Sequence, residues 1–541
     1  MVLPTVDDCV ALVADARARG TRGTIVIPIA ERLLADQLTP VLAYRRLVAP
    51  DERTAPSFLL ESVEGGERQG RYSILGARPI IEVIAREHEV RVTHHRAGQS
   101  TGRSDSARHA SHQGTDPLVV TREISASMTL LTAAAKARAE ELPRAFLGGW
   151  VGYAAYDSVR YAEPEKLAFE RAPRDDRGLA DVAFGFYDGV VIFDHVDKIV
   201  HVIQLVMVEP DADPRAAHAA AAAKLAARVE DIQRHSKPLP SGKLGRDTRP
   251  APLPSNMTRE QHATMINQAL EYIRAGDIFQ VVLGQRFERA STADPFDVYR
   301  ALRAVNPSPY MTYMQAPGCI LVASSPEILC RVRRKADGFE VTNRPLAGTR
   351  RRGATREEDL ALERELLADP KERAEHVMLV DLGRNDVGRV AVPGTIRAHP
   401  VMEVERYSHV MHISSTVTGT MMPGLDCWDA LRAALPVGTI SGAPKIRAMQ
   451  IIDELEPIRR GPYGGGFGYV GLDGQMDIAL ALRTIVTPTA LHQNNTWTYH
   501  LQAAGGIVAD SQIDDEYMET INKSAALARA IDLAESAFGG A

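Results

Sequence analysis

Two pairs of glutamates are spaced so that each pair can act as a unit. Glu372 and Glu375 lie three residues apart in "KERAEHVMLVDLGRND", and Glu516 and Glu519 repeat the spacing in "DDEYMETINKS". Apolar residues recur at helical spacing in both stretches, so each pair shares one helix face. Like charges there repel by about a few tenths of a kcal/mol, and the helix dipole returns a similar amount. Solvated helix ends and a shared cation both remain open.

A cation shared by the two pairs would be a hard divalent ion, because all four ligands offer only oxygen. Mg²⁺ typically takes one or two carboxylates directly and keeps waters that other carboxylates can bind. The sequence therefore offers a candidate Mg²⁺ site between two predicted helices.

Two further polar residues fall within predicted strands. In "DIFQVVLGQRF", Gln280 shares a sheet face with Ile278 and Val282, and an exposed edge glutamine is the alternative. In "MDIALALRT", Arg483 lies beyond Ala479 and Ala481 on one face of a strand. Its planar fork suits a carboxylate, with an arginine at the sheet rim as the alternative.

Two glycine-containing stretches are interpreted from the residues that flank them. "GFGYVG" matches a dinucleotide-binding pattern, but the sequence after it predicts a hairpin with a turn at Asp473 and Gly474, which excludes that fold. "LAGTRRRG" predicts a small-residue turn whose backbone N–H groups and Thr349 hydroxyl can hold a carboxylate. The arginines of this stretch are interpreted as solvated surface.

The elements around these residues indicate an α+β chain. The first half alternates strand-like and polar stretches and ends in an alanine-rich helix, and its polar segment at residues 96–117 predicts a mobile surface loop. A capping box at Thr258 and Gln261 opens a helix that Gly276 ends. We predict an N-terminal domain at 1–235, a Pro- and Gly-rich linker at 236–254 and a catalytic domain at 255–541.

Composition excludes several classes of protein. The 541 residues are 45% hydrophobic and 24% charged, which is ordinary for a globular chain with two or more domains. The formal net charge of -6 argues against a nucleic-acid surface. The four cysteines have no metal-binding spacing, the N-terminus does not resemble a signal peptide, and no apolar run is long enough for a membrane span. We expect a cytoplasmic protein.

Taken together, the ordered motifs resemble the chorismate-utilising enzymes, and among them the anthranilate synthase component I family. The resemblance covers roughly residues 20–210 and 255–535 and rests on "SSPE", "RPLAGTRRRG", "KERAEHVMLVDLGRND", "RYSHVMH", "GTISGAPK", "GPYGGGFGY", "ALRT" and "DDEYMETINKS". It implies two mainly antiparallel, orthogonal sheets packed as a sandwich with helices outside. It also implies a lyase that converts chorismate and ammonia to anthranilate and pyruvate through 2-amino-2-deoxyisochorismate, the first committed step of tryptophan biosynthesis.

The resemblance implies roles for the residues singled out above. Mg²⁺ would bind Glu375 and Glu519 directly, with Glu372 and Glu516 supporting through water. The implied substrate-binding residues are Gly348, Thr349, Thr439, Tyr463, Arg483, Ala504, Gly505 and Gly506. Glu327 of "SSPE" would be the general acid, and His412 would serve the elimination of pyruvate, with His409 as the nearest confusion.

Two positions distinguish this chain from its nearest enzymatic rivals. Family members that add water look as if they carry a lysine base where this chain has Gln280, and ammonia needs no such base. Aminodeoxychorismate synthases typically have a nucleophilic lysine where this chain has Ala347. Both positions favour amination at C2, and Ala347 disfavours an aminodeoxychorismate synthase. Intact Glu327, His412 and the four metal-site glutamates argue against a non-catalytic tryptophan-sensing subunit.

The resemblance also implies regulation and a partner. Feedback inhibition by tryptophan would use the stretches "LLES" and "NPSPYM", with Leu60, Glu61, Ser62, Asn306, Pro307, Ser308, Pro309, Tyr310 and Met311 forming the inhibitor site. No glutaminase sequence follows residue 535, so ammonia should come from a separate glutamine amidotransferase subunit in a heterotetramer or another hetero-oligomer. One departure from the family pattern is Ala504, where a glycine is expected, which predicts a tighter substrate site.

Overall fold

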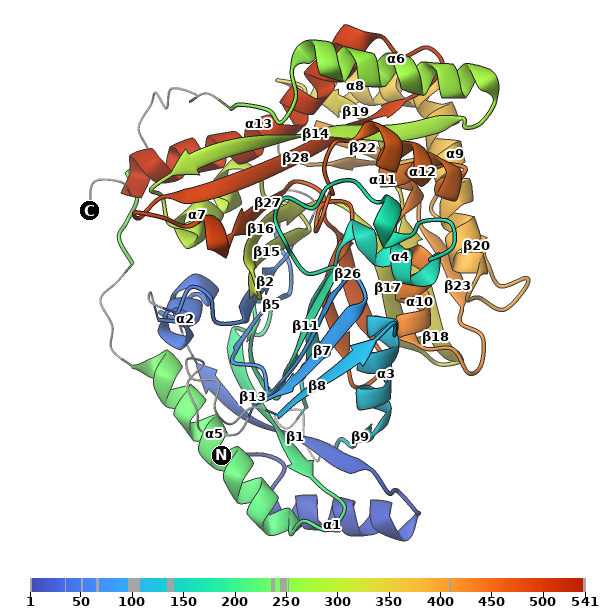
Figure 1. Cartoon of the computed structure of the whole chain (residues 1–541). Coiled ribbons are helices and arrows are strands. Elements are labelled where there is room, and N and C mark those ends of the chain that lie inside the picture. Colours follow the sequence, from blue (N-terminus) through green and yellow to red (C-terminus); the bar gives the residue numbers. More distant parts are fainter. Residues whose placement is uncertain are drawn as a thin grey trace.

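The computed structural model confirms an α+β chain built on two large, mainly antiparallel sheets (Figure 1). It describes residues 2–34, 36–49, 52–64, 68–95, 108–133, 141–234, 239–243, 251, 253–407 and 410–538. Most of the predicted linker at 236–254, including 244–250, lies outside the described residues. None of the helices in the described ranges is long and apolar enough to cross a membrane.

The first sheet has 12 strands, which follow the order β24-β14-β28-β27-β16-β15-β2-β5-β12-β13-β1-β9. Its strands are β1 (Thr24–Leu34), β2 (Ser57–Glu61), β5 (Tyr72–Ala77), β9 (Met128–Leu130), β12 (Gly189–Asp194), β13 (Ile199–Val208), β14 (Gln280–Ser291), β15 (Tyr310–Ala316), β16 (Cys319–Ser325), β24 (Gly442–Ala443), β27 (Thr484–Pro488) and β28 (Trp497–Ile507). All its pairings are antiparallel except that of β1 with β9.

The second sheet has 11 strands, in the order β20-β23-β18-β17-β26-β25-β10-β11-β6-β7-β8. They are β6 (Ile81–Arg86), β7 (Glu89–His94), β8 (Arg108–Gln113), β10 (Gly149–Ala154), β11 (Val182–Tyr187), β17 (Ile328–Lys335), β18 (Gly338–Arg344), β20 (Arg397–Ala398), β23 (Val417–Thr420), β25 (Gly466–Gly471) and β26 (Met476–Leu480). The hairpin predicted around Asp473 and Gly474 is confirmed as β25 and β26. A small third sheet joins β19 (Leu346–Arg351), β22 (Val410–Ser414) and β21 (Glu403–Arg406), and β3 (Val63–Glu64) pairs with β4 (Arg68–Gln69).

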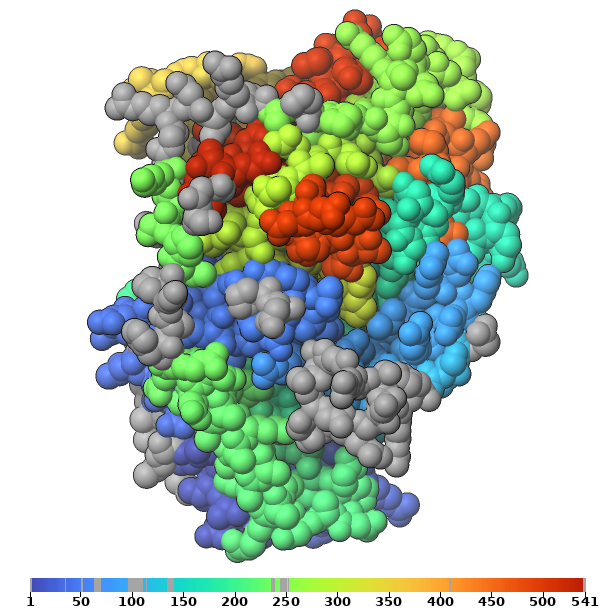
Figure 2. Space-filling model, turned by 60° about the vertical axis from the view of Figure 1, so that its left-hand side comes forward, coloured from blue at the N-terminus to red at the C-terminus, as the bar shows by residue number. Residues whose placement is uncertain are grey.

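Strands from both sides of the predicted boundary share each large sheet. β2 of the first half pairs with β15 of the second, and β10 pairs with β25. In Figure 2 the blue, N-terminal part of the chain occupies the lower half and the C-terminal part the upper, with the two in broad contact. The sheets therefore run through both parts of the chain.

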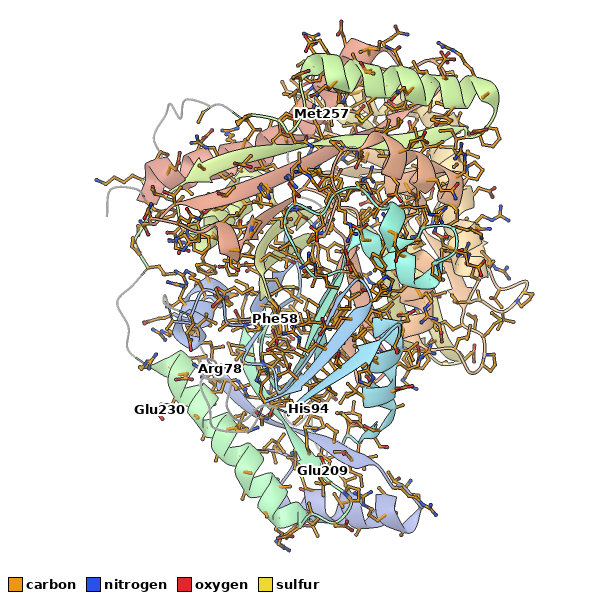
Figure 3. The ribbon with its side chains drawn as sticks, viewed as in Figure 1. Phe58, Arg78, His94, Glu209, Glu230 and Met257 are labelled. Atoms are coloured by element: carbon orange, nitrogen blue, oxygen red, sulfur yellow. The ribbon has the colours of Figure 1, made fainter. Side chains whose placement is uncertain are left out.

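Apolar side chains fill the space between the two sheets and cover their outer faces. Phe58 of the first sheet is fully buried and lies edge-on to Tyr187 of the second, with ring centroids 4.8 Å apart (Figure 3). The outer face of the 12-stranded sheet packs on α1 (Val6–Ala18), α2 (Pro40–Leu47), α5 (Pro214–Gln233), α7 (Pro295–Val305) and α13 (Ile513–Phe538). The outer face of the 11-stranded sheet packs on α3 (Pro117–Ala126), α9 (Pro370–Gly388), α10 (Cys427–Ala434) and α11 (Gly438–Ser441).

The described chain also has helices that pack on β14 and on the small sheet. α6 (Arg259–Ala275) and α12 (Lys445–Leu455) pack over β14, α8 (Arg356–Ala368) packs on the small sheet, and α4 (Val159–Ala162) is a single turn. Short 3₁₀ turns lie at Tyr156–Ser158, Phe169–Arg171 and Thr489–Leu491. The capping box of α6 and the left-handed Gly276 that ends it are confirmed.

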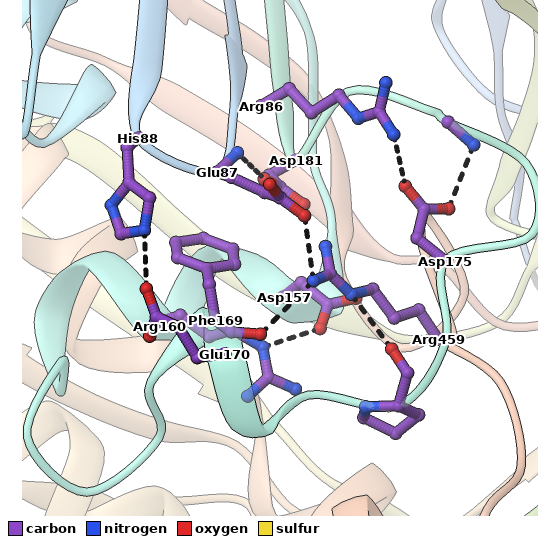
Figure 4. A network of polar contacts seen from close by, with 12 residues as sticks. Arg86, Glu87, His88, Asp157, Arg160, Phe169, Glu170, Asp175, Asp181 and Arg459 are labelled. Carbon is purple, nitrogen blue, oxygen red and sulfur yellow. Dashed lines mark hydrogen bonds and ion pairs between the residues drawn. The ribbon is translucent and has the colours of Figure 1, made fainter.

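A partly exposed polar network also joins distant segments (Figure 4). Arg459 forms an ion pair with Glu87 at 3.0 Å and donates to the Phe169 and Pro173 carbonyls. Asp181 accepts the Glu87 N–H at 2.6 Å. These contacts tie the β6–β7 turn to the chain before β25.

Three predictions about local structure were wrong in detail. The polar segment at 96–117 is no continuous loop: residues 96–107 lie outside the described residues, but Arg108–Gln113 forms β8 by pairing with β7. "LAGTRRRG" forms the bulged strand β19 instead of a turn, with Gly348 at φ +66°. Arg483 follows the end of β26 with φ 45°, because the chain turns there into β27.

Candidate functional site

The glutamate pairs on α9 and α13 meet at the end of the β14–β28 hydrogen-bonded pair. Gln280 is 2% exposed and donates its amide to Glu375 Oε1 at 3.1 Å, so the alternative of an exposed edge glutamine is excluded. A Cβ at Gly506 would lie 2.6 Å from the Gln280 amide nitrogen and 3.7 Å from Glu375. A larger residue at this position would therefore require the Gln280 amide to shift.

Glu375 lies in the field of the other carboxylates. Burial is the main cause that raises its pKa, and Glu372 and Glu519 raise it further, whereas the Gln280 hydrogen bond and Lys523 lower it. The two helices are thus close enough for their carboxylates to repel, as expected around a cation position.

Glu516 and Glu519 of α13 face the backbone of Gly505. A Cβ added at Gly505 would lie 2.9 Å from Glu516 Oε2 and 3.5 Å from Glu519 Oε2. Ser511 donates to Glu516 Oε1 at 2.6 Å, while the buried Glu516 Oε2 has no hydrogen-bond partner among the described residues. Burial, followed by repulsion from Glu519, raises the pKa of Glu516.

The four glutamates offer a metal ion only oxygen atoms. Within the described ranges, no three His, Cys, Asp or Glu side chains are grouped closely enough to hold an ion together. The unpartnered Glu516 oxygen and the convergence on Gly505 nevertheless leave room for an oxygen-seeking ligand. Carboxylate oxygens, with water in the remaining positions, are the type of ligand that Mg²⁺ prefers.

Lys523 belongs to the site and was missed by the sequence analysis. It lies one turn beyond Glu519 on α13, with its amine 2.6 Å from Glu519 Oε1 and 2.9 Å from the Ala504 carbonyl oxygen. Its positive charge offsets part of the local carboxylate repulsion. The Glu-to-Lys spacing of four residues was the available signal.

Glu327 lies between β16 and β17 and is 3% exposed. Burial raises the pKa of its carboxyl to about 8, although the Thr439 hydroxyl, at 3.0 Å from Oε1, and the Leu346 N–H stabilise the ionised form. Thr439 therefore lies beside this carboxyl. At neutral pH Glu327 holds a proton that it can donate, as a general acid must.

The pH dependence of the reaction provides a test of this assignment. Because the acid works only when protonated, we expect the rate, divided by the concentration of free ammonia, to fall above about pH 8 as Glu327 ionises. A neutral His412, whose pKa is lowered to about 4, predicts a flat profile between about pH 5.5 and 7.5. Initial rates at saturating chorismate would check this, and a profile that stays flat to pH 9.5 would contradict the protonated acid.

His412 is held by one ring nitrogen and leaves the other free. Its Nδ1 lies 2.9 Å from the Gly348 carbonyl oxygen and 3.1 Å from the Thr349 hydroxyl. Burial, followed by the charge of Arg483, lowers its pKa to about 4. With Nδ1–H donated to Gly348, the buried Nε2 carries a lone pair and has no partner among the described residues. His409 lies outside the described residues.

Arg483, one of the substrate-binding residues predicted from the family, lies in the electrostatic field of His412. Arg483 makes no hydrogen bond or ion pair through its guanidinium with another described side chain, although burial lowers its pKa. Its charge interacts with Tyr407 and His412, so its guanidinium lies near these two side chains. Tyr463 is buried, and its hydroxyl interacts with the Ala504 N–H. An unpaired cation of this kind suits a substrate carboxylate.

Ala504 pairs with Gly284 across β14 and β28. A Cβ at Gly284 would lie 2.9 Å from the Ala504 methyl group, so the extra methyl is accommodated by a glycine on the neighbouring strand. The Ala504 carbonyl accepts a hydrogen bond from Lys523, and the Ala504 N–H interacts with the Tyr463 hydroxyl. Alanine at this position, where the family pattern has glycine, thus keeps both backbone groups in the site.

A buried ion pair positions the strands behind the site, and the sequence analysis missed it as well. Arg460 and Glu456 pair at 2.6 Å, four residues apart and just after α12. Glu456 accepts the Gly284 N–H at 2.9 Å, and Arg460 donates to the carbonyls of Val282 and Ile440. This pair fixes β14 relative to the segment that carries Thr439.

Arg350 and Arg352 are not solvated surface, which corrects the earlier interpretation for these two, whereas Arg351 is 67% exposed in its side chain, as expected. Arg350 is 21% exposed in its side chain and contacts Glu365, Asp369 and Glu372. Arg352 pairs with Asp359 at 2.9 Å. The carboxylates of α8 and α9 attract these side chains, and Arg350 thereby holds Glu372 on the site side of α9.

The two stretches predicted to form an inhibitor site come together. Met311 of β15 pairs with Glu61 of β2, and Asn306 donates to the Ser324 hydroxyl at 3.0 Å behind them. A cavity of about 750 Å³ opens between the sheets at this place. Of the predicted inhibitor residues, it is lined by Leu60, Glu61, Ser62, Pro309 and Tyr310, and its wall continues to Pro326, Ile328 and Tyr407.

Comparison with known proteins gives consistent similarities. Residues 87–529 match the family of chorismate binding enzymes. The chain is 50% identical to the anthranilate synthase alpha subunit 1, chloroplastic, of Arabidopsis thaliana, over 98% of this chain and 89% of that protein. It is 46% identical to anthranilate synthase component 1 of Thermus thermophilus, over 94% and 98%. The crystal structure of anthranilate synthase component I from Streptococcus pneumoniae superposes with a TM-score of 0.67 at 34% identity, covering 92% of this chain and 99% of that one.

Proposed function

This chain belongs to the chorismate-binding enzymes and, among them, to the anthranilate synthase component I family, and we propose that it forms anthranilate from chorismate and ammonia. The reaction has two halves: amination to 2-amino-2-deoxyisochorismate and elimination of pyruvate. The observation that carries the proposal is that β19 contacts both groups: the Leu346 N–H bonds a protonated, buried Glu327, and the Gly348 carbonyl bonds a neutral His412 whose Nε2 has no partner among the described residues. These are an acid for the first half and a base for the second.

Chorismate would be held by its two carboxylates. Glu375 and Glu519 would hold Mg²⁺, with Glu372 and Glu516 supporting it through water, and the ion would supply Lewis-acid polarisation of the ring carboxylate. Gly348, Thr349 and the Gly505 backbone would orient this carboxylate. Arg483, Tyr463 and the Gly506 backbone would orient the enolpyruvyl carboxylate, for which the unpaired guanidinium is suited.

In the first half, ammonia forms a bond to C2 of the ring while the bond from C4 to its hydroxyl oxygen breaks. Glu327 gives its proton to that oxygen, so water leaves. The positively charged nitrogen then loses a proton and becomes a neutral amine. Gln280 cannot remove a proton from water, and it is itself tied to Glu375 at 3.1 Å. The buried Ala347 offers no amine for covalent attack, which disfavours an aminodeoxychorismate synthase.

In the second half, a base removes the proton from the carbon that bears the amine. The bond from C3 to the enolpyruvyl oxygen breaks, and the leaving enolpyruvate takes up a proton to become pyruvate. His412 Nε2 is the candidate base, since its lone pair has no other partner among the described residues. The ring becomes aromatic, which drives the step.

One assay tests the proposal. Purified protein with chorismate, ammonium at alkaline pH and Mg²⁺ should produce anthranilate, followed by its fluorescence. Folded protein that consumes no chorismate under these conditions would refute the proposal. Formation of an aminated product that keeps nitrogen at C4 would support the aminodeoxychorismate alternative.

We further propose that a separate glutamine amidotransferase supplies the ammonia and that the complex is a cytoplasmic hetero-oligomer, with anthranilate destined for tryptophan. Names such as "alpha subunit" among the relatives support a partner subunit. Co-purification with a glutaminase, followed by glutamine-dependent turnover, would test this.

Feedback inhibition by tryptophan is proposed for the 750 Å³ cavity between the sheets. Its wall combines the β2 and β15 elements with the chain on either side of Glu327, since Pro326 and Ile328 line it. A ligand there would contact the segment that carries the general acid. This shared segment supports coupling between the inhibitor cavity and the site.

Replacing Tyr310 should weaken the inhibition. Its ring lines the cavity, and its hydroxyl is fixed by Asp477 at 2.9 Å and Arg331 at 2.8 Å. Tyr310→Ala should raise the tryptophan concentration for half-inhibition about tenfold, through loss of an aromatic contact worth roughly 1 kcal/mol and of its anchor. Tyr310→Phe keeps the ring and should change this value much less. Equal inhibition of the wild type and the alanine variant would exclude Tyr310 from the inhibitor site.

A further inference from the structure

Tyr407, just after β21, has a specific relation to His412. The two rings lie edge to face, with centroids 5.7 Å apart and an angle of 61° between their planes. Both side chains are buried. Glu405 lies directly opposite His412 in the pairing of β21 with β22, so Tyr407 reaches back over the histidine from the end of the neighbouring strand.

His412 needs such a neighbour because its hydrogen bonds constrain only one end of the ring. Both polar contacts, to the Gly348 carbonyl and the Thr349 hydroxyl, use Nδ1. Contacts at one nitrogen leave the imidazole free to swing about that end, which would move Nε2 away from its target. Packing against a second ring removes this freedom.

Tyr407 is itself held on several sides. Its hydroxyl donates to Glu405 Oε2 at 2.9 Å, and Glu405 pairs with Arg344. The Tyr407 N–H donates to the Val410 carbonyl at 2.8 Å, and its own carbonyl accepts from Arg352 at 2.6 Å. Backbone and side chain are thus both fixed, so the ring forms a rigid wall.

We propose that Tyr407 is a positioning residue for His412, whose ring aims Nε2 at the proton removed in the elimination half of the reaction. The inference rests on the proposed function and deepens it, since it assigns Tyr407 to one of the two half-reactions. The Glu327 carboxyl is held by the Thr439 hydroxyl and the Leu346 N–H, and among the described residues it has no hydrogen bond with Tyr407, so the amination half should depend little on this ring.

The test measures the two halves separately in Tyr407→Leu. A displacement of about 1 Å in a catalytic group can cost roughly 100-fold in rate. We expect anthranilate formation from supplied 2-amino-2-deoxyisochorismate to fall by about 10- to 100-fold, and the intermediate to accumulate from chorismate on chromatography. Consumption of chorismate should change by less than about threefold. His412→Asn should show the same pattern more strongly.

Two variants serve as controls. Tyr407→Phe keeps the ring and should keep the product ratio near that of the wild type. Tyr161→Leu removes another tyrosine that donates to a carboxylate, Asp181 at 3.2 Å, and packs edge-on against Phe169, with centroids 5.1 Å apart; it should not accumulate intermediate. Thermal melting would verify that each variant folds.

The outcomes separate the two proposals. Failure of the wild type to form anthranilate would refute the proposed function. An active wild type together with a Tyr407→Leu variant of unchanged product ratio would overturn the role of Tyr407 alone. Accumulation in Tyr161→Leu, or an equal defect in Tyr407→Phe, would also overturn it, because the effect would then not come from the ring beside His412.

Discussion

Glu327→Gln is expected to lower the rate of anthranilate formation by about 10³-fold. The side chain is 3% exposed, and its pKa of about 8 keeps it protonated at neutral pH, so it can give a proton to the departing C4 hydroxyl. General acids contribute about 10²- to 10⁴-fold, and glutamine has nearly the same shape without an acidic proton. The measurement is chorismate consumption at saturating ammonia. A variant within tenfold of the wild type would remove Glu327 from this role.

Stability provides the control for this variant. The folded-state pKa of Glu327 lies above the ordinary value of 4.5, so the native state retains a proton that the unfolded chain releases between those values. The free energy of unfolding of the wild type should therefore lose a contribution as pH rises from about 5 to 8. Glu327→Gln should lack this contribution and melt with a weaker pH dependence, which distinguishes lost chemistry from lost structure.

Glu519→Gln is expected to abolish turnover that depends on Mg²⁺. Its carboxylate faces the Gly505 backbone, across from Glu375, and contributes to the field that raises the pKa of Glu375. Removing one direct ligand of a hard cation should raise the Mg²⁺ concentration for half-activation by about 100-fold or more, in the range of a lost charge-assisted contact of about 3 kcal/mol. Binding of Mn²⁺, followed by electron paramagnetic resonance, would measure the site without turnover.

The matched control is Asp514→Asn in the first turn of the same helix. Asp514 is 78% exposed in its side chain and pairs with Arg259. Its replacement by asparagine therefore removes the same charge from α13 without changing a residue of the site. Metal affinity and activity should remain near those of the wild type. Tryptophan binding should persist in both variants, and equal Mg²⁺ affinity of Glu519→Gln and the wild type would exclude Glu519 as a ligand.

Much of the fold could be predicted from local patterns and the resemblance. Helical periodicity placed Glu372 and Glu375 on α9, and Glu516 and Glu519 on α13, while the turn at Asp473 and Gly474 identified a hairpin. These features depend on spacing within about 20 residues, which a single sequence records directly. The family resemblance supplied the sandwich architecture, which strand patterns alone could not establish.

The rest depends on contacts between distant segments. Spacing along the chain did not reveal that Gln280 is tied to Glu375, or that the arginines after Gly348 are drawn to carboxylates of α8 and α9. The left-handed turn at Arg483 has no signal of its own, since it arises where β26 must leave one sheet and β27 must enter the other. Even the orientation of His412 depends on Gly348, which pairs with its strand only in the folded chain.

The pairing of β10 with β25 has a consequence for folding during synthesis on the ribosome. Gly149 pairs with Gly471, so β10 has no partner on that edge until more than 300 further residues have been made. At synthesis rates of about 5–20 residues per second, this edge waits roughly 15–60 s. Tyr153 on this strand is buried in the finished molecule beside Cys319, which is also made much later. We therefore expect the nascent chain to depend on chaperones, and its yield to be limited by aggregation more than by equilibrium stability.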